Sequence, residues 1–166
     1  AVFVSPSALD QRQPAVGALC EAVAAAGVPL RLIGAGDRLV ASDDVTIRVL
    51  GPAGNVDYGD DNANSLVLVL TYRGREILLT GDLEGGGLEA LLAAPQRNID
   101  VLMAPHHGSR NANTIDLARW CGPDYVIVSG GRRSTDRLSD IYSDDTRVLS
   151  TWTSGAITVT IDEEGQ

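Results

Sequence analysis

The sequence predicts an α/β fold built on a β-sheet of mixed direction. Two apolar runs at residues 66–72 and 76–80 are joined by a glycine-containing turn, which is the pattern of an antiparallel hairpin. Further along, apolar strand patterns at residues 101–104 and 125–128 enclose a helical pattern at residues 114–121. Because strands that alternate with helices usually pair in parallel, a hairpin followed by this alternation predicts one mixed sheet.

The elements before the hairpin follow from short local patterns. An apolar run at residues 2–4 indicates a strand, and the Ala- and Leu-rich residues 14–26 indicate a helix that Gly and Pro stop. Residues 30–33 indicate a second strand, and the alternation over residues 45–50 has the period of a half-buried strand. Residues 51–64, dense in Gly, Pro, Asn and Asp, are expected to form a loop.

The elements outside the central α/β unit are less regular. A short helix is expected at residues 88–94, after a flexible glycine run at residues 85–87. Residues 132–145 are polar and poorly periodic, which predicts a loop that can include one helical turn. The last strands are expected at residues 147–149 and 156–161.

The length and composition predict one globular domain, residues 1–166. The chain is 44% hydrophobic and 21% charged, and 166 residues can enclose one sizeable core. Its apolar runs are too short to span a membrane, and the start lacks the pattern of a signal peptide. Because residues 1–4 already have a strand pattern and no Met precedes them, we expect an N-terminally truncated domain from a longer protein.

The charge and the cysteines limit the classes of function. A net charge of −9 argues against a module that binds nucleic acid through clustered cations, but not against a nuclease whose metals contact the phosphate. Cys20 and Cys121 have no CxxC spacing, so two buried free thiols are favoured over a disulfide, and the redox compartment stays open.

The two histidines of the chain are adjacent and directly follow a predicted buried strand. His106 and His107 lie between Pro105 and Gly108, and Asp82 follows the end of another strand. Strand ends are the usual place for active-site residues in α/β sheets, and Asp and His together suit Zn²⁺ or Mn²⁺. The alternatives are a histidine pair in a surface loop and an aspartate that only forms a turn.

Three segments of the chain form an ordered pattern: NANSLVLVL at residues 62–70, ILLTGDLE at 77–84 and DVLMAPHHGS at 100–109. In this order they resemble the ComEC-type branch of the metallo-β-lactamase superfamily. The resemblance continues in the strand near residues 125–130 and at residues 155–157.

This resemblance implies an αββα sandwich with a dinuclear metal site, of which the chain supplies the later part. Asp82 matches the metal-bridging aspartate, and His107 matches the histidine ligand. His106 would then be the catalytic partner that contacts either a metal ligand or the transition state. Which histidine has which role stays open. Asn64 and Ser65 are expected to shape the loop and the strand start.

The sequence also departs from that family. The H-x-H-x-D-H segment, which supplies most of the metal ligands in that family, is absent. A complete domain would hold two divalent ions (Zn or Mn), whereas this chain would bind only part of that metal pair or none. Truncation and a natural, inactive half-site are the two explanations. Residues 132–137 carry three arginines where the family often has G-H-P, and these contact phosphate or are simply solvated.

The resemblance implies a metal-dependent hydrolase domain of a ComEC-like DNA-uptake protein. Such a domain is expected to be a phosphodiesterase or nuclease that degrades the non-transported DNA strand, with DNA and a membrane channel segment of the same protein as partners. It would be a soluble domain of a membrane-associated bacterial protein, on the extracytoplasmic side. A stand-alone hydrolase of another ester or phosphoester and a non-catalytic interaction module are the alternatives.

Overall fold

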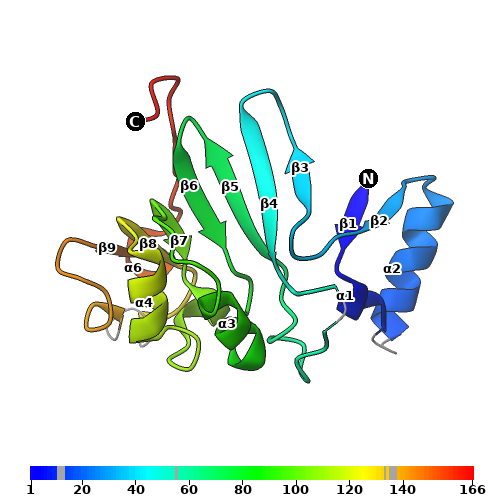
Figure 1. Cartoon of the computed structure of the whole chain (residues 1–166), viewed down its shortest axis with the longest axis horizontal. Coiled ribbons are helices and arrows are strands. Elements are labelled where there is room, and N and C mark those ends of the chain that lie inside the picture. The colour runs from blue at the N-terminus through cyan, green and yellow to red at the C-terminus, as the bar shows by residue number, and fades with distance from the viewer. Residues whose placement is uncertain (11–13, 55, 133, 135–137) are drawn as a thin grey trace.

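The main element of the computed structural model is a seven-stranded sheet (Figure 1). The structure describes residues 1–10, 14–54, 56–132, 134 and 138–166. The strand order is β3-β4-β5-β6-β7-β8-β9, antiparallel from β3 to β6 and parallel from β6 to β9, so the predicted mixed direction is confirmed. The strands are β3 Arg38–Val40, β4 Val45–Gly51, β5 Val67–Tyr72, β6 Arg75–Leu79, β7 Val101–Met103, β8 Tyr125–Val128 and β9 Arg147–Ser150.

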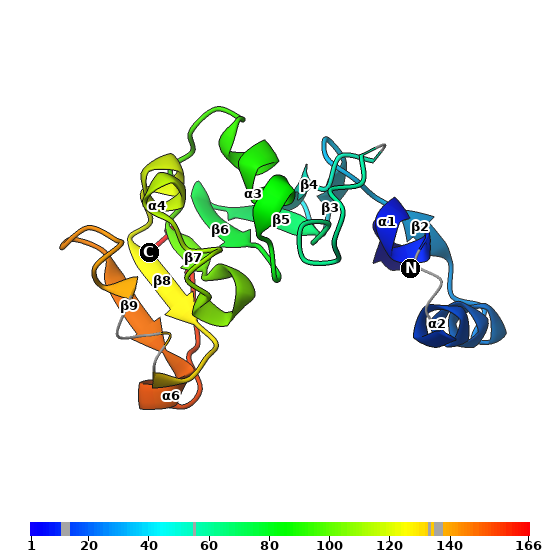
Figure 2. The same cartoon turned by 90° about the horizontal axis from the view of Figure 1, so that it is seen from below.

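One face of this sheet is covered by two helices, α3 (Gly85–Leu92) and α4 (Ile115–Cys121), as Figure 2 shows. Leu78, Leu102 and Val126 are paired across β6, β7 and β8 and are fully buried beneath them. Because successive side chains of a strand alternate between faces, this row fixes which side of every strand meets the helices. The helices contribute Leu88, Leu91, Leu117 and Trp120 to the same core.

The opposite face of the sheet carries apolar side chains that are only half-buried. Leu70 and Ile77 are cross-strand partners on this face, and neither is fully buried. Residues 156–161 lie over its parallel half and enclose a cavity of about 440 Å³ with Ile127 and Leu149. A strand was predicted here, and that prediction is wrong: the segment pairs with no strand of the sheet.

A smaller unit precedes the large sheet and lies to one side of it (Figure 2). Strands β1 (Val2–Val4) and β2 (Leu30–Leu32) pair in parallel, with α1 (Pro6–Asp10) and α2 (Pro14–Ala25) between them in the chain. Among the described residues of α2, only Val23 is buried. This unit therefore buries little apolar surface of its own.

Two further predictions need correction. Residues 85–87 are not a flexible lead into a helix, because α3 begins at Gly85. A Cβ atom at Gly87 would overlap the carbonyl of Ala63, so this glycine allows the helix to pack against a loop. Both cysteines are free, but Cys20 is only half-buried whereas Cys121 is buried. Helix α6 (Thr151–Ser154) was not predicted either.

Within the described ranges, no helix is long and apolar enough to cross a membrane.

Candidate metal centre

Strands β6 and β7 run in parallel and end side by side, which brings the predicted site residues to one edge of the sheet. The Thr80 hydroxyl donates to the Met103 carbonyl at 2.9 Å, and the His106 backbone N–H donates to the Gly81 carbonyl at 3.0 Å. These two bonds join the chain segments just after the strands. Asp82 is thereby positioned beside the histidine pair.

The histidine turn has an unusual backbone. His106 (φ 48°), His107 (φ 54°) and Gly108 (φ 81°) are three consecutive residues in or near the left-handed region. This conformation costs a non-glycine residue roughly 1–2 kcal/mol. Contacts elsewhere must therefore hold the two histidines in place.

Asn113 supplies these contacts from beneath the turn. Its side-chain amide donates to the carbonyls of Pro105 (3.0 Å) and Ser109 (2.8 Å), on either side of the histidines. Its own oxygen accepts a hydrogen bond from the Tyr142 hydroxyl at 3.2 Å. Asn113 is only 1% exposed, so these bonds are shielded from water.

His107 points its Nε2 atom at Asp82. The distance from Nε2 to Asp82 Oδ1 is 3.6 Å, and both side chains are well exposed. His107 Nδ1 lies 2.9 Å from the Ser129 carbonyl oxygen, which can only accept a hydrogen bond. Nδ1 therefore carries the proton, and this is the arrangement that prepares Nε2 of a histidine to bind a metal. A Cβ atom at Gly130 would lie 2.5 Å from the His107 carbonyl oxygen, so the next turn must stay free of a side chain.

His106 has a different set of partners. Its Nδ1 lies 3.1 Å from Glu84 Oε2, and the Asn62 amide donates to Glu84 Oε1 at 2.9 Å. The hydrogen bonds from Asn62 and His106 hold the pKa of Glu84 below its ordinary value, which keeps it a carboxylate. Glu84 thus orients the His106 ring.

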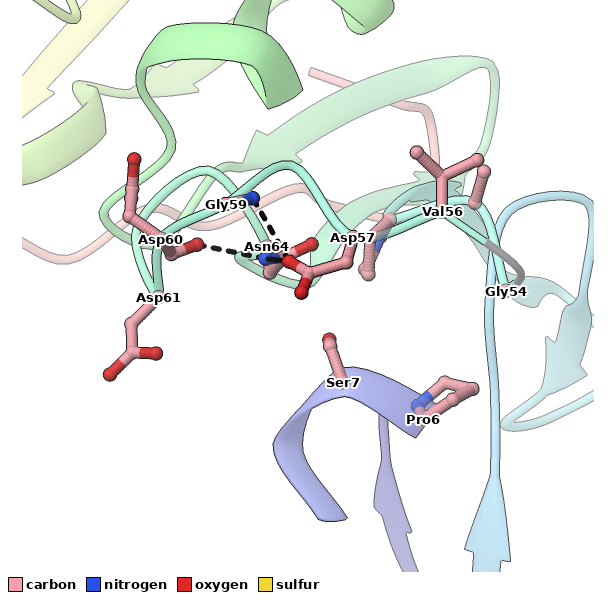
Figure 3. A pocket seen from close by; sticks show the side chains of 11 residues that line it. Pro6, Ser7, Gly54, Val56, Asp57, Gly59, Asp60, Asp61 and Asn64 are labelled. Atoms are coloured by element: carbon pink, nitrogen blue, oxygen red, sulfur yellow. Dashed lines mark hydrogen bonds between the residues drawn. The ribbon is translucent and has the colours of Figure 1, made fainter. Parts of the chain in front are cut away.

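The loop that carries Asn62 is fixed by its own polar side chains (Figure 3). Asn64 donates to Asp57 Oδ1 and to the Asp60 carbonyl, both at 2.8 Å, and accepts from the Tyr58 N–H. This agrees with the expectation that Asn64 shapes the loop. The Asp57 and Asp60 side chains line a cavity of about 370 Å³ between this loop and α1. Both carboxylates already accept hydrogen bonds within the loop, Asp57 from the Gly59 N–H and Asp60 from the Ala63 N–H.

The ligand atoms of Asp82 and His107 are of the type that divalent cations prefer and are suitably spaced, but two ligands are too few. Two ligands of a tetrahedral zinc ion lie about 3.4 Å apart, close to the 3.6 Å observed between these two atoms. Within the described part of the chain, no group of three or more His, Cys, Asp or Glu side chains could hold a metal ion.

The structure thus brings together Asp82, His106 and His107, as the strand-end argument expected. The sequence argument missed Asn113 and Tyr142, since nothing in a polar turn or an irregular segment marks a side chain as buried. The arginine-rich residues 132–137 fall largely outside the described residues.

No protein-family model matches the chain. Among solved structures, it is similar to a proposed metal-dependent hydrolase from Parabacteroides distasonis, with a TM-score of 0.53 and 18% identity over 78% of this chain and 60% of that one. It is also similar to a proposed zinc-dependent hydrolase of the metallo-β-lactamase superfamily from Thermotoga maritima, with a TM-score of 0.46 and 15% identity over 74% of this chain and 72% of that one.

Three curated relatives match part of the chain. The chain is 33% identical to ComE operon protein 3 of Bacillus subtilis over 109 residues, which is 65% of this chain. It is 36% identical to Recombination protein 2 of Haemophilus influenzae over 85 residues, or 51% of the chain. It is 35% identical to competence protein ComA of Neisseria gonorrhoeae over 74 residues, or 43% of the chain.

These similarities fit a ComEC-type metallo-β-lactamase-fold domain. The matches cover 10%, 14% and 11% of the lengths of the Haemophilus, Bacillus and Neisseria proteins, so the chain spans only a small part of each.

Proposed function

We propose that this ComEC-type domain is the metal-dependent hydrolase of a DNA-uptake protein and cleaves phosphodiester bonds of the DNA strand that is not transported. The observation that carries the proposal is the 3.6 Å approach of His107 Nε2 to Asp82 Oδ1 at the ends of two parallel strands. The competence relatives support the DNA-uptake context. In that context the domain would belong to a membrane-associated protein and lie on its extracytoplasmic side.

In this proposal, Asp82 and His107 hold divalent metal. Bound metal ions lower the pKa of a water molecule and neutralise charge on the phosphate. His107 directs its Nε2 atom toward Asp82, and the hydrogen bond from its Nδ1 to the Ser129 carbonyl fixes this orientation. Glu84 accepts the Nδ1–H of His106 and orients its ring, and His106 would contact a phosphoryl oxygen of the substrate.

The remaining ligands would come from a part of the domain outside this chain. Two donors are fewer than the three or four that a zinc or manganese ion takes from a protein. We therefore expect this chain by itself to bind divalent metal weakly or not at all. A second sheet packed on the half-buried apolar face would complete the two-sheet domain.

The test is calorimetric titration of Mn²⁺ and Zn²⁺ into the protein, with hydrolysis of bis(p-nitrophenyl) phosphate and single-stranded DNA as the activity assay. In a protein that includes the upstream segment, Asp82→Asn and His107→Gln should each abolish tight metal binding and hydrolysis. Asp116→Asn, which changes an exposed carboxylate on α4, is the matched control. Unchanged metal affinity in both site variants would refute the ligand assignment, and two tight sites in this chain alone would refute the expected shortage of ligands.

A further inference from the structure

Three arginines line one cavity beside the antiparallel half of the sheet, in a chain whose net charge is −9. The cavity measures about 390 Å³ and lies where β3, β4 and the segment after α3 meet. Its lining residues are Gly36, Asp37, Arg38, Arg48, Val49, Leu50 and Arg97.

Arg38 and Arg48 are direct cross-strand partners in the β3–β4 ladder. Directly opposed residues have Cβ atoms about 5 Å apart on the same face, and like charges in this arrangement destabilise a sheet. Neither guanidinium forms an ion pair or hydrogen bond with any residue that the structure describes. Asp37, the carboxylate in the lining, accepts instead from the Gly34 N–H at 2.8 Å. No carboxylate among the described residues therefore pairs directly with either guanidinium.

Arg97 adds a third guanidinium that is already oriented. Its Nη2 lies 2.7 and 3.0 Å from the two carboxylate oxygens of Glu76, and its Nε lies 3.2 Å from one of them. This pairing restricts the side chain, while Nη1 takes no part in it. Its backbone is held as well, because the Arg97 N–H donates to the Trp120 carbonyl at 3.0 Å.

We propose that Arg38, Arg48 and Arg97 form a binding site for a phosphate group. A phosphate carries the charge that the opposed pair lacks, and its oxygens match the planar donor pattern of guanidinium groups. The group could belong to a free phosphate or to the phosphodiester backbone of a nucleic acid strand. The site does not depend on the proposed hydrolysis, since phosphate binding by arginine requires no metal.

The arginine site is separate from the metal centre. Arg48 pairs with Val69 and Val69 with Leu78, so Arg48 is level with Leu78 across the sheet. Asp82 follows four residues later, beyond the end of β6. At about 3.3 Å per residue and 4.8 Å per strand, the two sites lie on the order of 15 Å apart.

The test measures binding to the purified protein in EDTA, which removes any contribution of the metal centre. Pyrophosphate and inorganic phosphate are titrated by calorimetry, and a labelled single-stranded oligothymidylate by fluorescence anisotropy. The test variant is Arg38→Gln/Arg48→Gln. The control is Arg31→Gln/Arg119→Gln, which removes the same charge from two exposed positions elsewhere.

The wild type and the control should bind alike, and the test variant should bind at least about tenfold more weakly, because charge-assisted hydrogen bonds are lost. For the oligonucleotide, the slope of log K against log salt should fall by about 1 to 1.5. Loss confined to the oligonucleotide identifies a phosphodiester ligand, and loss confined to free phosphate or pyrophosphate identifies a small anion.

A thermal measurement tests the same site without a binding signal. Phosphate should raise the melting temperature of the wild type and leave that of the test variant unchanged, and circular dichroism verifies that the variant folds. The alternative role for Arg38, blocking the exposed edge of β3, predicts no phosphate affinity. Absence of binding by the wild type, or an equal loss in the control, would overturn the proposal.

Discussion

Replacing Asn113 by alanine tests whether a buried amide holds the histidine turn. The change removes two hydrogen bonds to the carbonyls of Pro105 and Ser109 and leaves the Tyr142 hydroxyl unpaired in the core. At about 1 kcal/mol for each lost bond, with the unpaired hydroxyl counted, the free energy of unfolding should fall by about 3 kcal/mol. That is a large part of the 5–15 kcal/mol typical of a domain.

The local consequence is more specific than the loss of stability. Without Asn113, the left-handed backbone of the two histidines is no longer compensated, and it should relax toward negative φ. The hydrogen bond from the His106 N–H to the Gly81 carbonyl would then break. Urea unfolding measures the stability, and amide hydrogen exchange at His106 reports the turn.

Two variants serve as references for this experiment. Tyr142→Phe removes one hydrogen bond and should cost about 1 kcal/mol with little change in exchange at His106. Asn98→Ala changes an exposed asparagine and should cost less than about 0.5 kcal/mol. An Asn113→Ala protein that loses less than about 1 kcal/mol and keeps the His106 amide protected would show that the turn is held by something else.

Three other predictions concern packing, pH and thiol reactivity. Gly130→Ala should destabilise the fold by roughly 1–3 kcal/mol in urea unfolding, because its Cβ would meet the His107 carbonyl oxygen; a wild-type midpoint would contradict this. The pKa of Asp57 is lowered by a backbone N–H and a side-chain amide, so its stabilising effect is complete above pH about 3.8 and is lost as the pH falls below it. Asp57→Asn should therefore flatten the acid limb of stability against pH, and an unchanged limb would argue against that role. Burial raises the pKa of Cys121 to about 12, so iodoacetamide followed by mass spectrometry should label Cys20 in the folded protein and Cys121 only after unfolding.

Most of the sheet could be predicted because most of its strands coincide with runs of apolar residues in the sequence. Residues 66–72 and 76–80 correspond closely to β5 and β6, and residues 125–128 match β8. The strand β3 (Arg38–Val40) was missed, since only two apolar residues follow its arginine and no longer apolar run marks it.

The errors arose where sequence alone cannot show the partner. A glycine run suggests flexibility, but at Gly87 the Ala63 carbonyl lies so close that no side chain would fit. The strand predicted at residues 156–161 pairs with no strand of the sheet, and a strand requires a neighbour with free backbone groups.

The candidate site was predictable only in its outermost residues. Asp82 and His107 follow apolar strands, and topology then places such residues at a common edge. The orientation of His107 depends on a hydrogen bond to the Ser129 carbonyl. Every residue has a backbone carbonyl, so the sequence does not show which one accepts this bond.

The position of β6 has a consequence for assembly of the protein. This strand is both the last antiparallel and the first parallel member of the sheet, so it forms a seam between two halves with different folding requirements. Asp82 belongs to the hairpin half, whose pairing is local and expected to form early, whereas His107 arrives only after the crossover through α3 has docked. We therefore expect the contact between these two side chains to form late, and its presence in solution would show that the two halves of the sheet have joined at β6.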